Sequence, residues 1–248
     1  MKLKDKVCIV TGATSGMGKA IAKVLSSEGG KLILSGRNKE SGKALENSLD
    51  DAVFVPGDVT DPSYNKKLVD TALETYGKLD ILSLNAGILG LGSVKELSID
   101  SWRHTIDTNL SSIFYLCKYA LPNLLEQENG NILINASIAA FKSFPNHPAY
   151  CASKAASVAL MKQMAVDYAP KIRVNAICPG PVDTPLLWES TEAFENPATA
   201  VENAKRTTLL KRLGTPEDIS KLVLFLVSDD SSWITGTTVT IDGGIINT

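Results

Sequence analysis

Short, almost continuously apolar runs alternate along this chain with longer segments of helical character. Strands that are apolar toward both faces are typical of a parallel sheet covered on both sides. The pattern therefore predicts a parallel sheet of about seven strands. The runs that predict strands cover residues 6–10, 31–35, 52–56, 79–84, 130–136, 172–177 and 237–242.

Helix-length segments separate these runs. Asp61 and Thr215 stand where two of the helices begin and suit the N-cap position, and Pro216 suits the first helical position. Strand–helix alternation implies right-handed crossovers. We therefore predict an α/β fold, a Rossmann-like doubly wound sheet with helices on both faces, in one domain spanning residues 1–248. The helices are expected over residues 18–28, 41–49, 62–76, 102–127, 150–168 and 216–227.

The least regular stretch runs from Pro179 to Arg206 and contains Pro181, Pro185 and Pro197. Long irregular segments inside a compact domain are usually functional or mobile. We interpret residues 181–206 as a segment that covers a substrate.

Composition excludes several classes of function. The formal charge of −2 and the absence of a basic block argue against nucleic acid as a partner. Four widely spaced cysteines predict buried, reduced thiols, and only two histidines argue against a metal site. No run has membrane-spanning length. We expect a soluble, cytoplasmic protein with no membrane partner.

A glycine-rich turn, TGATSGMG, follows the first predicted strand and opens the first predicted helix. Gly12 would allow the tight turn, Gly16 the close approach of a pyrophosphate, and Gly18 close packing of helix against strand. The helix N-terminus would offer free N–H groups to phosphates. A plain glycine-rich turn is the alternative. The residues predicted to bind a cofactor here are Gly12, Thr14, Ser15, Gly16, Met17 and Gly18.

The second predicted strand ends without the acidic residue that would bind a ribose 2′-hydroxyl. Arg37 stands there instead, followed by Asn38, and a guanidinium matches a 2′-phosphate. A solvated surface arginine is the alternative. The sequence therefore favours NADP(H), with NAD(H) possible. Two later strand ends complete the predicted cofactor site with Asp58, Val59, Asn85, Ala86 and Gly87.

Tyr150 and Lys154 are four residues apart at the start of an apolar helical run. This spacing puts both side chains on one helix face. A nearby ammonium favours the phenolate, so the pair could exchange a proton near neutral pH. Upstream, Ser137 is the last residue of the run NILINAS. A chance pair is the alternative.

Together these motifs resemble the short-chain dehydrogenase/reductase family, in its short single-domain branch. The resemblance covers essentially the whole chain. It includes the glycine turn, LNAG with Leu84 in place of the family's first Asn, RVNAICPG and TGTTVTIDGG. Asn109, Ser137, Tyr150 and Lys154 match the family's catalytic set in identity and order.

The resemblance implies an oxidoreductase that transfers a hydride between NADP(H) and a carbonyl or alcohol. It implies that Tyr150 is the general acid/base and that Ser137 holds the carbonyl oxygen. Lys154 would lower the pKa of Tyr150 and bind the nicotinamide ribose, and Asn109 would anchor a water linking Lys154 to solvent. The family is commonly tetrameric, so we expect a homo-oligomer, a tetramer or dimer.

By the same resemblance, Pro179, Gly180, Val182 and Thr184 would lie beside the nicotinamide, with Trp188 and Phe194 covering the substrate. The predicted pocket is mostly apolar and favours a neutral ketone or alcohol; ordinary loop packing is the alternative for its members. A 3-oxoacyl-thioester reductase and a non-catalytic NADP-sensing protein stay open. The pocket candidates are Ile138, Phe144, His147, Leu186 and Trp188.

Overall fold

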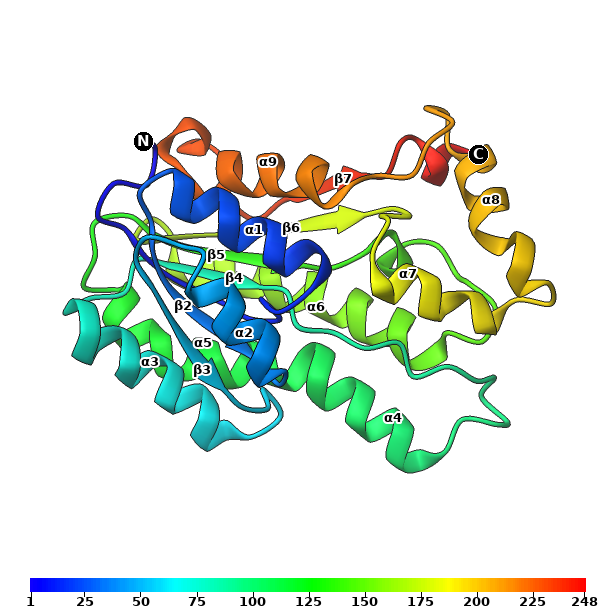
Figure 1. Cartoon of the computed structure of the whole chain (residues 1–248), viewed down its shortest axis with the longest axis horizontal. Coiled ribbons are helices and arrows are strands. Elements are labelled where there is room, and N and C mark those ends of the chain that lie inside the picture. Colours follow the sequence, from blue (N-terminus) through cyan, green and yellow to red (C-terminus); the bar gives the residue numbers. More distant parts are fainter.

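The computed structural model describes residues 1–248 as a single seven-stranded parallel sheet between two layers of helices (Figure 1). The strand order is β3-β2-β1-β4-β5-β6-β7, so the direction of winding reverses between β1 and β4. Ligands bind at such switch points, beyond the carboxyl ends of the strands. The predicted fold class is confirmed. The strands are β1 (Val7–Val10), β2 (Lys31–Gly36), β3 (Ala52–Pro56), β4 (Ile81–Leu84), β5 (Gly130–Asn135), β6 (Ile172–Pro179) and β7 (Thr238–Ile241).

Two hydrophobic cores flank the sheet because successive strand residues face opposite sides. Val7 and Ile9 of β1 belong to one core, and Cys8 and Val10 belong to the other. The first core packs against α3 (Pro62–Tyr76), α5 (Ser112–Leu124) and α6 (Pro148–Tyr168). The second packs against α1 (Gly16–Ser27), α2 (Lys39–Glu46) and α9 (Pro216–Val227).

The predicted helix starts at Asp61 and Thr215 are confirmed. Asp61 accepts a hydrogen bond from the Ser63 N–H at 2.8 Å. Thr215 and Asp218 form a reciprocal capping box at the start of α9. Cys8, Cys117 and Cys178 are buried free thiols, whereas Cys151 is half-buried. No helix of the chain is both long and apolar enough to cross a membrane.

The long helix predicted over residues 102–127 is interrupted. The structure has α4 (Ile99–Ile106), a π-helical turn (Asp107–Ser111) and then α5. The π turn contains Asn109, whose carboxamide bonds both backbone groups of Ile88, at 2.8 and 2.9 Å. Such turns are frequent at functional sites, and a hydrophobic pattern alone does not reveal them.

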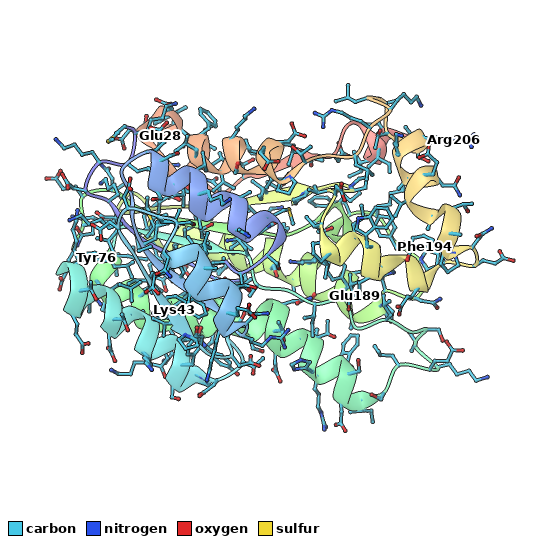
Figure 2. All side chains as sticks on the ribbon, in the orientation of Figure 1. Glu28, Lys43, Tyr76, Glu189, Phe194 and Arg206 are labelled. Carbon is cyan, nitrogen blue, oxygen red and sulfur yellow. The ribbon has the colours of Figure 1, made fainter.

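The stretch from 179 to 206, predicted to be irregular, contains two helices, α7 (Pro185–Ser190) and α8 (Pro197–Thr207). The prediction was wrong here because Pro185 and Pro197 each stand in the first turn of a helix, where no backbone N–H is required. Figures 1 and 2 show α7, Phe194 and α8 in sequence at the end of the sheet where β6 terminates. The start of α7, at Pro185 and Leu186, thereby lies beside the strand ends at the switch point.

Candidate active site

The glycine turn after β1 has the geometry of a phosphate cradle. Gly12 and Gly16 have φ of +63° and +48°, in the left-handed region that favours glycine. A Cβ on Gly18 would lie 2.2 Å from the carbonyl oxygen of Gly12, so Gly18 packs on the turn itself. Ser15, the N-cap of α1, makes no side-chain cap bond. The first N–H groups of α1 are therefore left for a ligand.

A groove of about 860 Å³, including space open to solvent, runs along this turn and across the switch point. It unites the six residues predicted from the glycine turn with Arg37, Asp58, Val59 and the stretch Asn85–Gly87. Thr108 also borders it, and its hydroxyl oxygen is buried without a partner. Sequence reasoning missed Thr108, along with Ser35, Gly36, Gly57, Ile88 and Pro185 on this wall.

Asn38, predicted as a cofactor residue, does not border the groove. It is the N-cap of α2, and its side-chain oxygen accepts from the Ser41 N–H at 2.9 Å. Helix capping satisfies the asparagine here. Its position next to Arg37 in the chain gave no sign of this alternative role.

Arg37 and Asp58 are the two charged residues on the groove wall. Burial disfavours ionisation of Asp58, but hydrogen bonds from Thr60 and the charge of Arg37 hold the pKa of Asp58 below its usual range. Arg37 itself is exposed. No carboxylate stands at the end of β2. This end of the groove suits an anionic substituent on a ribose.

Tyr150 and Lys154 lie one turn apart on α6, and the predicted shared face is confirmed. The Lys154 Nζ is 5.6 Å from the centre of the Tyr150 ring. It donates a hydrogen bond of 2.8 Å to the backbone oxygen of Asn135, at the end of β5. Ser137 follows β5, and its hydroxyl accepts from the Ala139 N–H at 3.1 Å. The end of β5 and the first turn of α6 thus meet at one site.

The ionisation of this pair differs from the sequence-based expectation. Burial raises the pKa of Tyr150 to about 12, although the nearby Ser137 hydroxyl acts in the opposite direction. Burial also lowers the pKa of Lys154 to about 8. In the chain by itself, desolvation outweighs the attraction between the ammonium and the phenolate. The phenol is therefore held protonated at neutral pH.

Asn109 is fully buried, and its carboxamide forms hydrogen bonds within the chain. Besides Ile88, it bonds the Ser153 hydroxyl at 3.0 Å, and Ser153 in turn donates to the backbone oxygen of Tyr150 at 2.7 Å. This chain of bonds holds the strand-end turn after β4 against α6. The role of Asn109 in anchoring a water stays a prediction.

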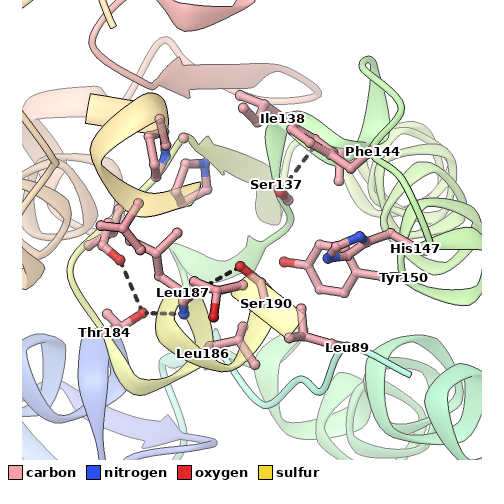
Figure 3. Close-up of a pocket in the computed structure, with 18 of the residues that line it drawn as sticks. Leu89, Ser137, Ile138, Phe144, His147, Tyr150, Thr184, Leu186, Leu187 and Ser190 are labelled. Atoms are coloured by element: carbon pink, nitrogen blue, oxygen red, sulfur yellow. Dashed lines mark hydrogen bonds between the residues drawn. The ribbon is translucent and has the colours of Figure 1, made fainter. Parts of the chain in front are cut away.

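A second cavity of about 900 Å³, including space open to solvent, adjoins the groove. The two share Met17, Thr184 and Leu186. Figure 3 shows the hydroxyls of Ser137 and Tyr150 at the wall of this pocket. Its other walls are predominantly apolar. Pro179, Gly180 and Val182 line this pocket rather than the groove. Lys154 lies behind the groove wall at Gly87, where a Cβ would be 3.6 Å from its Nζ.

The predicted pocket residues Ile138, Phe144, His147 and Leu186 all line this cavity. Trp188 does not: it is 54% exposed on α7, and its indole N–H donates to Asp183 at 2.8 Å. It lies on the outer side of α7, toward solvent. Residues missed in the sequence include Leu89, Ala139, Leu187, Ser190, Thr191, Ala200, Val201, Ala204 and Ile245.

For some of these missed residues, the sequence contained a pattern that could have identified them. Ala200, Val201 and Ala204 of α8 recur at helical spacing and present one small apolar face to the pocket. No such pattern identifies Ile245, because it reaches the pocket from the C-terminal segment beyond β7. Residues 246–248 follow it directly in the chain.

Comparison with known proteins agrees with this geometry. A family model described as enoyl-(acyl carrier protein) reductase, adh_short_C2, matches residues 12–246. The chain belongs to the short-chain dehydrogenase/reductase family. As a member of this family it is an oxidoreductase of alcohol and ketone groups with a nicotinamide cofactor.

Relatives in the short-chain dehydrogenase/reductase family differ in their substrates. A 3β-hydroxysteroid dehydrogenase of Mediterraneibacter gnavus is 38% identical over 98% of this chain and 95% of its own. A 3-oxoacyl-[acyl-carrier-protein] reductase of Thermotoga maritima is 35% identical over 99% and 100%. The structure of Thermoplasma acidophilum aldohexose dehydrogenase superposes with a TM-score of 0.91, at 34% identity over 99% of this chain and 96% of that one. Family membership alone therefore leaves the substrate open.

Proposed function

We propose that this chain is an NADP(H)-dependent ketone reductase or secondary-alcohol dehydrogenase for a small or medium neutral substrate. The observation that carries the proposal is the junction of two cavities. A groove with a phosphate cradle meets an apolar pocket at Met17, Thr184 and Leu186, and the Tyr150 and Ser137 hydroxyls border that pocket. Such a junction lets a nicotinamide and a carbonyl meet face to face.

The groove suits the cofactor. Phosphates would bind at the N-terminus of α1, where Ser15 leaves N–H groups uncapped. Arg37 would pair with the 2′-phosphate, and the unpartnered hydroxyl of Thr108 would find a partner on the nucleotide. When bound, the nicotinamide supplies or accepts the hydride.

The chain's own residues move and hold the proton. The raised pKa of Tyr150 keeps its hydroxyl protonated, ready to donate to the carbonyl oxygen as negative charge develops there. Ser137 donates a hydrogen bond to the same oxygen and stabilises that charge. Lys154 uses one of its three donors on Asn135, which leaves two for the cofactor sugar.

We further propose that α7 and α8 cover the bound substrate. Both helices contribute to the pocket wall, through Leu186 and Leu187 of α7 and through Val201 of α8. They exclude water from the site of proton transfer, as lids of this kind do. The homo-oligomer remains a prediction from the family resemblance, and the cytoplasmic location remains a prediction from the sequence.

The test is NADPH oxidation against ketones, aldehydes, sugars and acyl thioesters with the wild-type chain and two variants. Tyr150→Phe should lower kcat at least about 1000-fold, because the proton donor is lost, while NADPH binding persists. Tyr168→Phe, at the far end of α6, is the matched control and should keep its turnover. Retained turnover in Tyr150→Phe would reject the acid role. NADPH binding without any turnover in the wild type would favour a cofactor sensor.

A further inference from the structure

His147 is a buried imidazole at the wall of the apolar pocket. It immediately precedes α6 and is 5% exposed. Its ring packs among three aromatic rings, with centroid distances of 6.1 Å to Phe144, 6.1 Å to Tyr150 and 6.2 Å to Phe194. Figure 3 shows Phe144 and Tyr150 near it. This packing from three sides fixes the orientation of the imidazole beside the proton donor.

The hydrogen bond of His147 fixes its tautomer. Its Nδ1 lies 2.5 Å from the backbone oxygen of Pro145. A carbonyl oxygen only accepts, so Nδ1 must carry the hydrogen. Burial lowers the pKa of His147, which keeps the ring neutral. The other nitrogen, Nε2, is then a bare acceptor that cannot donate.

No group of the chain donates to that nitrogen. The side chain of His147 makes one hydrogen bond, to Pro145, and its Nε2 is not among the fully buried polar atoms that lack a partner. Three pocket hydroxyls already donate to backbone carbonyl oxygens: Thr184 to Val182, Ser190 to Leu187 and Thr191 to Trp188. Because His147 lines the pocket, its free acceptor is available to a molecule bound there.

We propose that His147 is a specificity-determining residue that accepts a hydrogen bond from a hydroxyl group of the substrate, distinct from the oxygen that reacts. This inference rests on the proposed function. A fixed acceptor has no partner on a plain ketone, an ether or a methyl group, and leaving it unpaired is unfavourable. The substrate class is thus a hydroxylated, otherwise apolar ketone, or the corresponding diol.

The experiment compares matched substrates. Cyclohexanones that carry a hydroxyl, methoxy or methyl group at positions 2, 3 or 4 are reduced with NADPH. At one position, the wild type should prefer the hydroxyl over the methoxy compound by roughly tenfold in kcat/KM, the value of one neutral hydrogen bond. His147→Phe keeps an aromatic ring among its neighbours but lacks the acceptor, so the preference should fall to about one. Phe144→Leu, a neighbouring pocket substitution, should change both rates together.

A second measurement does not depend on any variant. The chain has two histidines, His147 and the exposed His104, so ¹⁵N spectra of histidine-labelled protein are readily assigned with His104→Gln. The Nε2 signal of His147 should be that of an unprotonated nitrogen and should move when the hydroxyl compound binds with NADP⁺. A protonated Nε2, or equal rates for hydroxyl and methoxy compounds at every position, would overturn the proposal while leaving the reductase function intact. Absence of turnover with every carbonyl would overturn both.

Discussion

Replacing Lys154 by Met should make the cofactor-free chain more stable while abolishing turnover. Lys154 is 5% exposed, and burial moves its pKa from 10.5 to about 8. The unfolded chain therefore holds this proton more tightly than the folded chain does, and at pH 7 the buried charge opposes folding. Methionine is unbranched and apolar and fits a similar space without a charge.

The shifted pKa of Lys154 sets the size of this change in the free energy of unfolding. The change from 10.5 to about 8 corresponds to about 3 kcal/mol of unfavourable free energy at pH 7. Methionine cannot donate to the backbone oxygen of Asn135, and losing that bond costs about 1 kcal/mol. The net gain is about 2 kcal/mol, which raises Tm by roughly 4–8 °C for a chain of this size.

The pH dependence of the stability difference between Lys154→Met and the wild type tests whether the buried charge causes it. Below about pH 8 the gain is constant, because Lys154 is protonated in both states. Between pH 8 and 10.5 the folded chain has lost the proton and the unfolded chain still holds it, so the wild type gains relative to the variant as pH rises. The advantage of Lys154→Met should therefore vanish by about pH 10.

Urea unfolding followed by circular dichroism, at one protein concentration and at pH 7, 9 and 10, measures these differences. Lys162→Met is the matched control, because Lys162 is exposed on the same helix; its effect should stay within about 0.5 kcal/mol at every pH. A Lys154→Met variant that is less stable than wild type at pH 7, or an advantage that does not change with pH, would refute the reasoning.

Two further substitutions probe the groove. Arg37→Ala should raise KM for NADPH more than about tenfold and KM for NADH less than about twofold, because only the former carries the 2′-phosphate; equal effects in steady-state kinetics would contradict the assignment. Gly18→Ala should weaken NADPH binding more than about tenfold in a fluorescence titration, because its Cβ would lie 2.2 Å from the Gly12 oxygen. Gly77→Ala, where a Cβ meets nothing within 4 Å, should bind NADPH normally.

Hydrophobic periodicity was sufficient for the sheet and for most helices. The helix over Pro62–Tyr76 has the predicted bounds because its cap, its first proline and its final glycine are all local signals. The prediction of an irregular stretch over residues 179–206 was wrong because of its prolines. Pro185 and Pro197 start helices, and a residue pattern does not distinguish a proline that begins a helix from one that lies in a loop.

The site was predictable where residue type and spacing carry the chemistry, as for Tyr150 and Lys154. It was not predictable where tertiary contacts decide. Ile245 reaches the pocket from the far end of the chain, and Trp188 turns to solvent although its neighbour Leu187 lines the pocket. The ionisation of Tyr150 also depends on burial, which spacing along a helix does not describe.

The π turn at Asp107–Ser111 accommodates one residue more than a regular α-helix would hold. Deleting one residue there would close the turn into a regular helix and keep the relative orientation of α4 and α5, so the buried Thr105 and Leu116 would still face the interior. The widened turn at Asn109 would be lost, and with it the position from which the Asn109 carboxamide bonds Ile88. We expect such a deletion to leave the core intact and to disturb the site.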